Sequence, residues 1–268
     1  MDGDMHEQDS RPYQINTRVY HHRGIFSHYR LDTLAREDGV ALLKYQPAFA
    51  GKDVLDIGAG AGRTAIYLAP LAHRYQAIDY SPVMVRQFER ALPGIPIALA
   101  DMRDLSCFGQ ATFDFVLASN NVFDAVGHAD RLHTLHEVHR ILRPGGILMF
   151  SAHNRDVRKL WRAPRLHFTR NPATQAKRVV HWCRALANHA RLRRLQEDNQ
   201  DYAIVNDEAH DCGLLQYYIG PEAQRRQLAA LDFELLEILD AQGAPVPFGE
   251  RAEHSRWLLY VARRLPVS

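Results

Sequence analysis

The 268-residue sequence contains few cysteines, and their spacing argues against two kinds of scaffold. Cys107, Cys183 and Cys212 are odd in number, far apart, and in no CxxC or Cys/His ligand spacing. Neither a disulfide framework nor a structural zinc site is indicated, because both need cysteines at matched spacing. This cysteine usage fits a reducing compartment, and we expect a cytoplasmic protein.

Long apolar runs are also missing. The N-terminus, MDGDMHEQDSRPYQ, has no apolar core of the kind that a signal peptide needs. No stretch approaches the ~20 apolar residues of a membrane-spanning helix. The sequence has no internal repeat and no low-complexity tract. We therefore expect a soluble protein with no membrane partner.

A strong excess of either charge is absent as well. The formal net charge is +2 and the sequence pI is about 8.5, which neither demands nor excludes a polyanionic partner. With 46% apolar and 24% charged residues, the chain can bury a full core. Its length lies at the upper edge of what one α/β domain holds, so we expect one domain with insertions.

Short apolar runs recur along the chain and predict buried strands. Five of them lie at 52–57, 75–78, 95–100, 113–118 and 147–151, and two more at 233–239 and 257–262. Helical patterns separate the first five, most clearly at 130–142, where Pro144 stops the helix. Strands that alternate with helices predict an α/β fold with a doubly wound, mostly parallel, seven-stranded sheet. We expect the last strands to be antiparallel.

Two segments lie outside this alternation. We predict a helical cap at 1–46, with a helix from about Tyr20 to Tyr45, in front of a main domain at 47–268. The second segment is a helical insertion at 155–212, which we interpret as a lid and not as part of the sheet. Its long helix begins at Asn171-Pro172, an N-cap followed by a first helical residue.

The predicted insertion holds most of the positive charge of the chain. Residues 155–200 include twelve Lys or Arg and three acidic residues, a formal charge of +9. One side of the predicted helix is apolar and carries Val179, Trp182, Cys183, Leu186 and Ala190. We expect Trp182 to belong to the core. The charged side would then be a solvated helix face, a contact for an anionic acceptor or a contact for RNA phosphates.

A glycine-rich loop carries the strongest functional signal. The sequence from Asp56 to Arg63, DIGAGAGR, comes directly after the first predicted strand and directly before a helix. Glycines allow the backbone to turn tightly and to approach a ligand, and a helix N-terminus offers unpaired N–H groups. A dinucleotide-binding fingerprint would need glycine at position 63, so Arg63 argues against a nicotinamide oxidoreductase.

The spacing DxGxGxG resembles the first motif of class I S-adenosylmethionine-dependent methyltransferases, which have a Rossmann-like fold. The resemblance covers about 54–154 and includes Asp79 at the end of the second strand, in the place of the family's ribose-binding acid. Asp101 and Met102 match the adenine-binding positions, and LRPGG at 142–146 matches a family turn. The resemblance implies S-adenosylmethionine as cofactor. It assigns the cofactor to Asp56, Gly58, Ala59, Gly60, Asp79, Tyr80, Asp101, Met102 and Asn120.

The implied reaction needs alignment more than it needs acid–base chemistry. A sulfonium is already a good leaving group, so alignment of the nucleophile can supply ~7–11 kcal/mol of the barrier, and no metal is required. A hydroxyl acceptor gains from a general base, usually histidine. His153 is our first candidate, with Asn121 and Asn154 as substrate-binding residues. His153 could instead satisfy the strand-to-loop turn, and His128 and His210 are weaker candidates.

The sequence leaves the acceptor open. Nucleic-acid methylating relatives carry an Asn/Asp-Pro-Pro-aromatic motif, but residues 120–123 read NNVF, which argues against that subclass. The chain is more similar to the small-molecule branch, so we expect O- or N-methylation of a metabolite that could be anionic or contain a sugar. Two alternatives are an RNA-modifying enzyme that uses the basic insertion and a non-catalytic, cofactor-binding regulator. The oligomeric state is left open.

Overall fold

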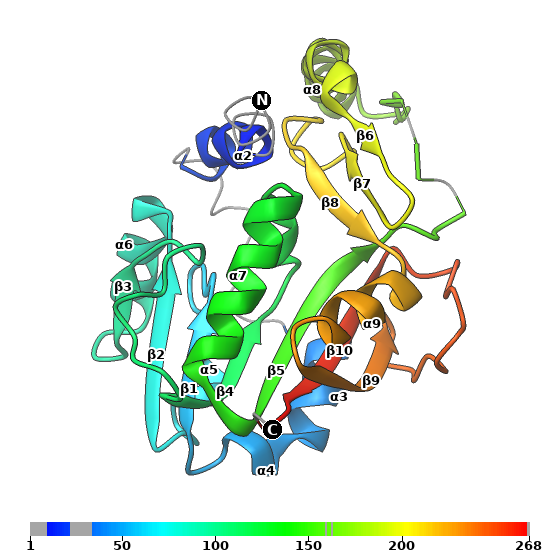
Figure 1. Ribbon diagram of the computed structural model, residues 1–268. Helices are drawn as coiled ribbons and strands as arrows, with labels where there is room; N and C mark the ends of the chain where they lie inside the picture. Colours follow the sequence, from blue (N-terminus) through cyan, green and yellow to red (C-terminus); the bar gives the residue numbers. More distant parts are fainter. Residues whose placement is uncertain (1–9, 22–33, 159, 162, 267–268) are drawn as a thin grey trace.

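The computed structural model describes residues 10–21, 34–158, 160–161 and 163–266 (Figure 1). Its centre is a ten-stranded sheet with a parallel half. That half runs in the order β3 (Ile97–Leu99), β2 (Arg74–Asp79), β1 (Asp53–Ile57), β4 (Phe113–Ala118) and β5 (Leu142–Asn154). Two antiparallel strands, β10 (Trp257–Arg264) and β9 (Phe233–Asp240), continue from β5. The predicted α/β class with a mostly parallel sheet that ends in antiparallel pairing is confirmed, and the seven predicted strands are present, but the sheet has ten strands and not seven.

Helices cover both faces of the sheet, and the strand sequences explain why. In β4, Phe113 and Val116 face one core while Phe115 and Leu117 face the other. A parallel strand with apolar residues on both faces needs cover on both sides. One core includes α7 (His128–Ile141) and α9 (Pro221–Ala229), and the other includes α3 (Arg36–Lys44), α4 (Gln46–Phe49), α5 (Ala65–Leu68) and α6 (Pro82–Ala91).

The second half of the predicted insertion belongs to the sheet, which corrects our interpretation of that segment. Residues 155–220 include β6 (Glu197–Asp198), β7 (Tyr202–Val205) and β8 (Gln216–Ile219), in addition to α8 (Pro172–Leu192) and η3 (Arg193–Leu195). β8 pairs with the end of β5, and β7 and β6 follow it. The alternating pattern did not reveal these strands because they are short and the loops between them are polar.

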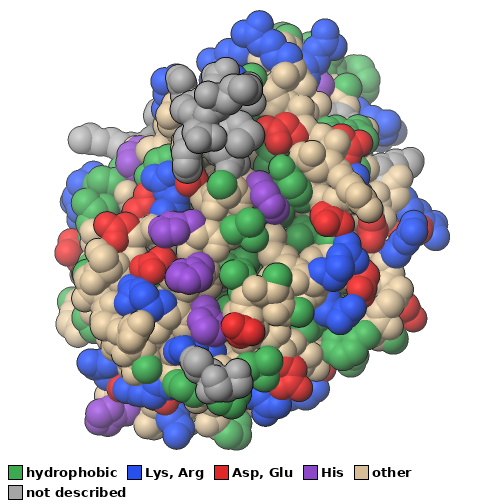
Figure 2. All heavy atoms as spheres, viewed as in Figure 1, with side chains coloured by type: hydrophobic (Ala, Val, Ile, Leu, Met, Phe, Trp, Pro, Cys, Tyr) green, Lys and Arg blue, Asp and Glu red, His purple; other side chains and the backbone are tan. Residues whose placement is uncertain are grey.

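The apolar side of α8 faces solvent, which contradicts the interpretation of that side as a core-facing one. Val179 and Leu186 are each 37% exposed, whereas Trp182 is half-buried and donates its indole N–H to the Pro164 carbonyl. Only Ala185 and Leu192 of α8 are buried. Lys and Arg side chains gather at the top of the molecule, over α8 (Figure 2).

The N-terminal helix α2 (Arg11–Tyr20) is fixed to the body of the protein by one buried side chain. The Asn16 amide donates to the carbonyls of Ala125 and Leu215, at 2.8 Å and 2.7 Å, and accepts from the Leu215 N–H at 2.9 Å. The predicted helix from Tyr20 to Tyr45 is described only at its ends, because 22–33 lie outside the described residues. In the described parts of the chain, no helix has the length and apolar composition to cross a membrane.

Candidate active site

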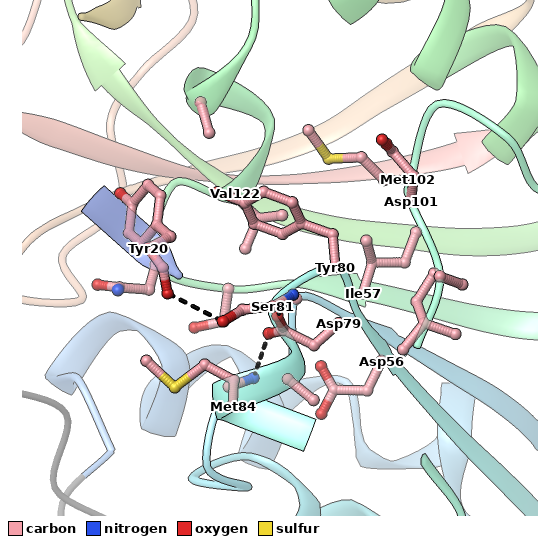
Figure 3. A pocket seen from close by; sticks show the side chains of 18 of the residues that line it. Tyr20, Asp56, Ile57, Asp79, Tyr80, Ser81, Met84, Asp101, Met102 and Val122 are labelled. Carbon is pink, nitrogen blue, oxygen red and sulfur yellow. Dashed lines mark hydrogen bonds between the residues drawn. The ribbon is translucent and has the colours of Figure 1, made fainter. Parts of the chain in front are cut away.

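A first cavity lies at the carboxyl ends of β1, β2 and β4, where ligands bind in open α/β sheets. Figure 3 shows the side chains that line it. Its wall includes all nine residues to which the sequence assigned the cofactor, together with Tyr13, Tyr20 and Val122. The topology brings these residues together because parallel strands end at the same edge of the sheet.

The glycine loop lines this cavity, and one of its glycines has no room for a side chain. Gly58 has φ +67°, and a Cβ there would lie 2.6 Å from a Val122 methyl carbon. Gly60 also has a positive φ of +57°, but a Cβ there would meet nothing within 4 Å. The first glycine therefore serves packing, while the second only satisfies the turn.

Asp79 points into the first cavity as a buried carboxylate (Figure 3). Its two oxygens accept from the N–H groups of Ser81 at 2.8 Å and Gly60 at 2.9 Å. Burial raises the pKa of Asp79 to about 6, although both hydrogen bonds act in the opposite direction. A buried carboxylate with lone pairs left over is suited to accept from the hydroxyls of a ribose.

The other two predicted acids are held by protein groups. Asp56 is buried and accepts from Thr64 Oγ1 at 2.5 Å and Tyr75 Oη at 2.8 Å. Its carboxylate therefore fixes the loop from beneath. Asp101 accepts from the Arg103 guanidinium at 2.8 Å. Burial raises the pKa of Asp101, but the hydrogen bonds from Arg103 outweigh it and hold the pKa below its usual value.

Helix α2 closes the first cavity, which the sequence did not predict. Tyr13 and Tyr20 line the wall, and their rings lie 5.8 Å and 6.2 Å from the ring of Tyr80. The Ser81 hydroxyl donates to the Tyr20 carbonyl at 2.9 Å, as Figure 3 shows. No local signal marks Tyr13 or Asn16, because their partners are distant in sequence.

A second cavity, of about 470 Å³, adjoins the first and shares Tyr20, Asn120 and Asn121 with it. The position of the second cavity follows from the strand pairing around His153. This residue pairs with Trp257 on β10 and with Tyr218 on β8, so the two partners occupy opposite edges of β5. On the edge of β5 that pairs with β8, the pairing with β4 ends at Ala118, opposite Phe150. The second cavity opens between the end of β4 and β8.

His153 lines the second cavity, and a buried aspartate fixes its ring. Asp124 Oδ2 accepts from the His153 backbone N–H at 2.6 Å and lies 2.8 Å from Nδ1. Because an ionised carboxylate only accepts, this contact assigns the ring proton to Nδ1 and leaves the lone pair on Nε2. Asp124 Oδ1 accepts from Arg131 at 2.6 Å, and both of these side chains are fully buried.

Asn121 lines both cavities and has an unusual backbone conformation. Asn120 and Asn121 have φ values of +61° and +59°, in the left-handed region that costs a non-glycine residue energy. Asn121 Nδ2 lies 3.3 Å from His153 Nε2, and the Asn121 backbone N–H donates to Ser151 Oγ at 2.8 Å. The buried Oδ1 of Asn121 has no hydrogen-bond partner among the described residues. The contact of Asn121 with His153 leaves no room for a further group between them, so an acceptor would bind beside this pair.

Helix α8 contacts the second cavity through a loop, and no described Lys or Arg of α8 lines the cavity itself. His210, Asp211 and Cys212 follow one another with φ values of +51°, +55° and +52°. Asp211 is held by His181 Nδ1 at 2.9 Å and by the Asn188 amide at 3.0 Å, both from α8. This contact positions His210, which lines the cavity. The interpretation of the insertion as a lid stays a prediction.

Two other candidates have different surroundings from those expected. Asn154 is fully buried, and its amide donates to the carbonyls of Arg251, Ala252 and Ser255. The structure therefore corrects the prediction that Asn154 binds substrate, because the amide fixes a loop. His128 Nδ1 lies 2.8 Å from Tyr217 Oη, and His128 is not among the residues that line either cavity.

The fold and the first cavity define a Rossmann-like protein with a site for an adenosyl cofactor. Residues 54–146 match a family model described as "Methyltransferase domain". They belong to the class I S-adenosylmethionine-dependent methyltransferase family, whose donor is S-adenosylmethionine.

Curated relatives support the same family. A probable S-adenosylmethionine-dependent methyltransferase of Mycolicibacterium smegmatis is 32% identical over 107 residues, 40% of each chain. A ubiquinone biosynthesis O-methyltransferase of Methylocella silvestris is 33% identical over 151 residues, 53% of this chain and 54% of the relative. The chain thus spans about half or less of the length of these relatives.

Solved structures share the fold at low sequence identity. A methyltransferase of Clostridium acetobutylicum aligns with TM-score 0.59 and 14% identity over 91% of this chain and 97% of its own. A 1,6-didemethyltoxoflavin-N1-methyltransferase of Burkholderia thailandensis, solved with S-adenosylhomocysteine, aligns with TM-score 0.54 and 18% identity over 88% and 80%.

The first cavity fits S-adenosylmethionine. The buried Asp79 carboxylate matches a ribose, and the close approach of Gly58 leaves backbone beside the ligand. Met102 and Tyr80 supply apolar and aromatic surface for an adenine ring. The cofactor would supply a methyl group on a positively charged sulfur.

Proposed function

We propose that the protein transfers the methyl group of S-adenosylmethionine to a hydroxyl or amine of a small molecule held in the second cavity. The observation that carries the proposal is the contact of His153 Nδ1 with the buried Asp124, which directs Nε2 to Asn121, where the two cavities meet. An acceptor would replace Asn121 Nδ2, 3.3 Å away, as the hydrogen-bond donor to Nε2. Because an acceptor loses a proton when it gains a methyl group, a base at this junction has a defined task.

The protein's own residues then have distinct roles. Asp79 and the glycine loop hold the donor, and Asn121 Oδ1 accepts from a second N–H or O–H of the acceptor, not from the group that loses its proton to His153. His153 Nε2 takes the proton, while Asp124 holds the ring in the tautomer that can do so and stabilises the positive charge that forms on it. Asp124 is thus a positioning residue, and Arg131 in turn holds Asp124.

The names of similar proteins support both kinds of acceptor atom. One relative is named an O-methyltransferase of ubiquinone biosynthesis and one structural neighbour an N1-methyltransferase. Since the site supplies a base, an oxygen acceptor or an amine that binds as ammonium would both gain from it. A free amine would need only alignment.

Two measurements test the proposal. Calorimetry should show binding of S-adenosylhomocysteine but not of a nicotinamide dinucleotide, and labelled S-adenosylmethionine should transfer its methyl group to a member of a metabolite panel. Donor binding without transfer to any member would favour a cofactor-binding regulator. Tight RNA binding that weakens with salt at a log–log slope steeper than about −3 would favour an RNA substrate.

A further inference from the structure

The wall of the second cavity is acidic. Among the described residues, the acidic ones that line it are Glu37, Asp207 and Glu208 and the basic one is Arg256, which gives a formal charge of −2 with histidines neutral. None of the Lys or Arg residues of α8 is among the described residues that line it. The basic residues of α8 therefore do not set the charge of the acceptor site, to which the insertion contributes Asp207 and Glu208.

The acidic residues are arranged around His153. On one side, Trp257 lies opposite His153 in the β5–β10 pairing and donates its indole N–H to Glu37 Oε1 at 2.7 Å. On the other side, Tyr218 stacks on the His153 ring at 4.6 Å and donates its hydroxyl to Asp207 Oδ2 at 2.9 Å. The proposed base thus lies between two aromatic residues, each bonded to a carboxylate.

The two carboxylates differ in how far the protein neutralises them. Asp207 Oδ2 lies 4.0 Å from Arg256 Nη2, so a cation already faces it. Glu37 is 5% exposed and its Oε1 accepts from the neutral Trp257 indole, while Arg63 bonds to the neighbouring Asp38 at 3.2 Å. Burial raises the pKa of Glu37. A positive ligand group would stabilise this carboxylate, whereas an anionic ligand would repel it.

We propose that the acceptor carries a protonated amine, which binds beside Glu37 and Trp257 while its methylated atom lies beside His153 and Asn121. The Glu37 carboxylate at the N–H edge of the Trp257 indole provides a counter-ion for an ammonium group. The inference rests on the proposed function, whose second cavity it assigns to a substrate class, and it disfavours the anionic acceptor that the basic insertion suggested.

A pair of ligands of nearly equal shape and opposite charge tests the proposal. Dopamine and 3,4-dihydroxyphenylacetate share a catechol ring and differ in an ammonium or a carboxylate. We would measure the affinity of each by calorimetry, with S-adenosylhomocysteine saturating the first cavity. Dopamine should bind at least about tenfold more tightly than 3,4-dihydroxyphenylacetate, because a hydrogen bond to a charged group contributes about 1.5–3 kcal/mol.

Variants connect this preference to Glu37. Glu37→Gln keeps an oxygen for the Trp257 indole but loses the charge, so it should remove most of the preference. Asp207→Asn should reduce it less, because Arg256 already faces Asp207. Glu234→Gln, on the exposed part of β9, is the matched control and should leave it unchanged.

Three results would overturn the proposal: equal or tighter binding of 3,4-dihydroxyphenylacetate, no binding of dopamine in the millimolar range, or an unchanged preference in both Glu37→Gln and Asp207→Asn. S-adenosylhomocysteine binding, measured in the same titrations, shows that each variant is folded. It also separates the two proposals, since failure of the donor to bind contradicts the proposed function, whereas a lost charge preference with normal donor binding contradicts only this inference.

Discussion

Arg131 Nη1 and Asp124 Oδ1 lie 2.6 Å apart, and both side chains are fully buried. The guanidinium also donates to Gln224 at 2.8 Å, so its position is fixed on more than one side. The second oxygen of Asp124 holds His153. The buried ion pair therefore connects the core behind α7 to the ring at the acceptor site.

Removal of Asp124 should affect both stability and turnover. Asp124→Asn leaves Arg131 buried without its counter-ion, so the free energy of unfolding should fall by about 3–5 kcal/mol, as is common for a broken buried pair. Chemical denaturation measures this change. The exposed Asp104→Asn is the control and should change stability by less than about 0.5 kcal/mol. Equal stability of the Asp124 variant and the wild type would contradict the buried pair.

Replacement of His153 tests the proposed base directly. His153→Gln should lower turnover by ~10²–10⁴-fold with a hydroxyl acceptor and leave S-adenosylhomocysteine affinity nearly unchanged, because His153 lines only the second cavity. The exposed His136→Gln should behave as wild type. With an amine that binds as its free base, the variant should mainly raise the acceptor KM. Wild-type turnover and KM would return His153 to a structural role.

The affinity for the donor should depend on pH through Asp79. Because burial raises the pKa of Asp79 to about 6, the folded protein without ligand loses stability from this group as the pH rises through that value. Donor binding has the opposite sign, since ribose hydroxyls donate to the ionised carboxylate. S-adenosylhomocysteine affinity should therefore fall as the pH drops below about 6.

The matching variant is Asp79→Asn, which cannot ionise. It should bind S-adenosylhomocysteine more weakly at neutral pH, and it should lose the share of the pH dependence that Asp79 contributes. Calorimetry at pH values on both sides of 6 measures both effects. The same pH profile in the variant as in the wild type would assign the titration to another group, such as Asp56, whose pKa burial also raises to about 6.

The two glycines of the loop should tolerate alanine differently. Both have positive φ, so each alanine variant should lose roughly 1–2 kcal/mol of stability from the backbone alone. Gly58→Ala adds a collision with Val122, so thermal denaturation should show a greater loss than for Gly60→Ala. The additional change Val122→Ala should recover part of it. Equal losses in both single variants would contradict the close approach.

Neutralisation of the basic helix should not affect a small acceptor. Lys177 and Arg191 of α8 and Arg194 of the adjoining η3 are exposed and line neither cavity. A triple change of these residues to Gln should keep turnover and acceptor KM within about twofold of wild type, since charges distant in water are screened. A large rise in KM would indicate that α8 contacts the acceptor after all. Arg256→Gln, inside the second cavity, is the contrasting variant and should change KM.

The sequence by itself determined the parallel sheet and the first cavity. Each strand, the glycine loop and Asp79 carry a local signal, and right-handed connections bring the ends of parallel strands to one edge. His153 and Asn121 were found in the same way, because both follow the ends of neighbouring strands. Such features depend on a few consecutive residues, and a single sequence is sufficient to read them.

Only the tertiary structure decided the second cavity. Asp124 is 29 residues from His153, and Glu37 is 220 residues from Trp257, so no local spacing marks either contact. The short strands of the insertion join the sheet through pairing with β5, and the apolar side of α8 remains in solvent. Periodicity predicts that a helix has an apolar side, but which side is buried depends on the surfaces that the rest of the chain presents to it.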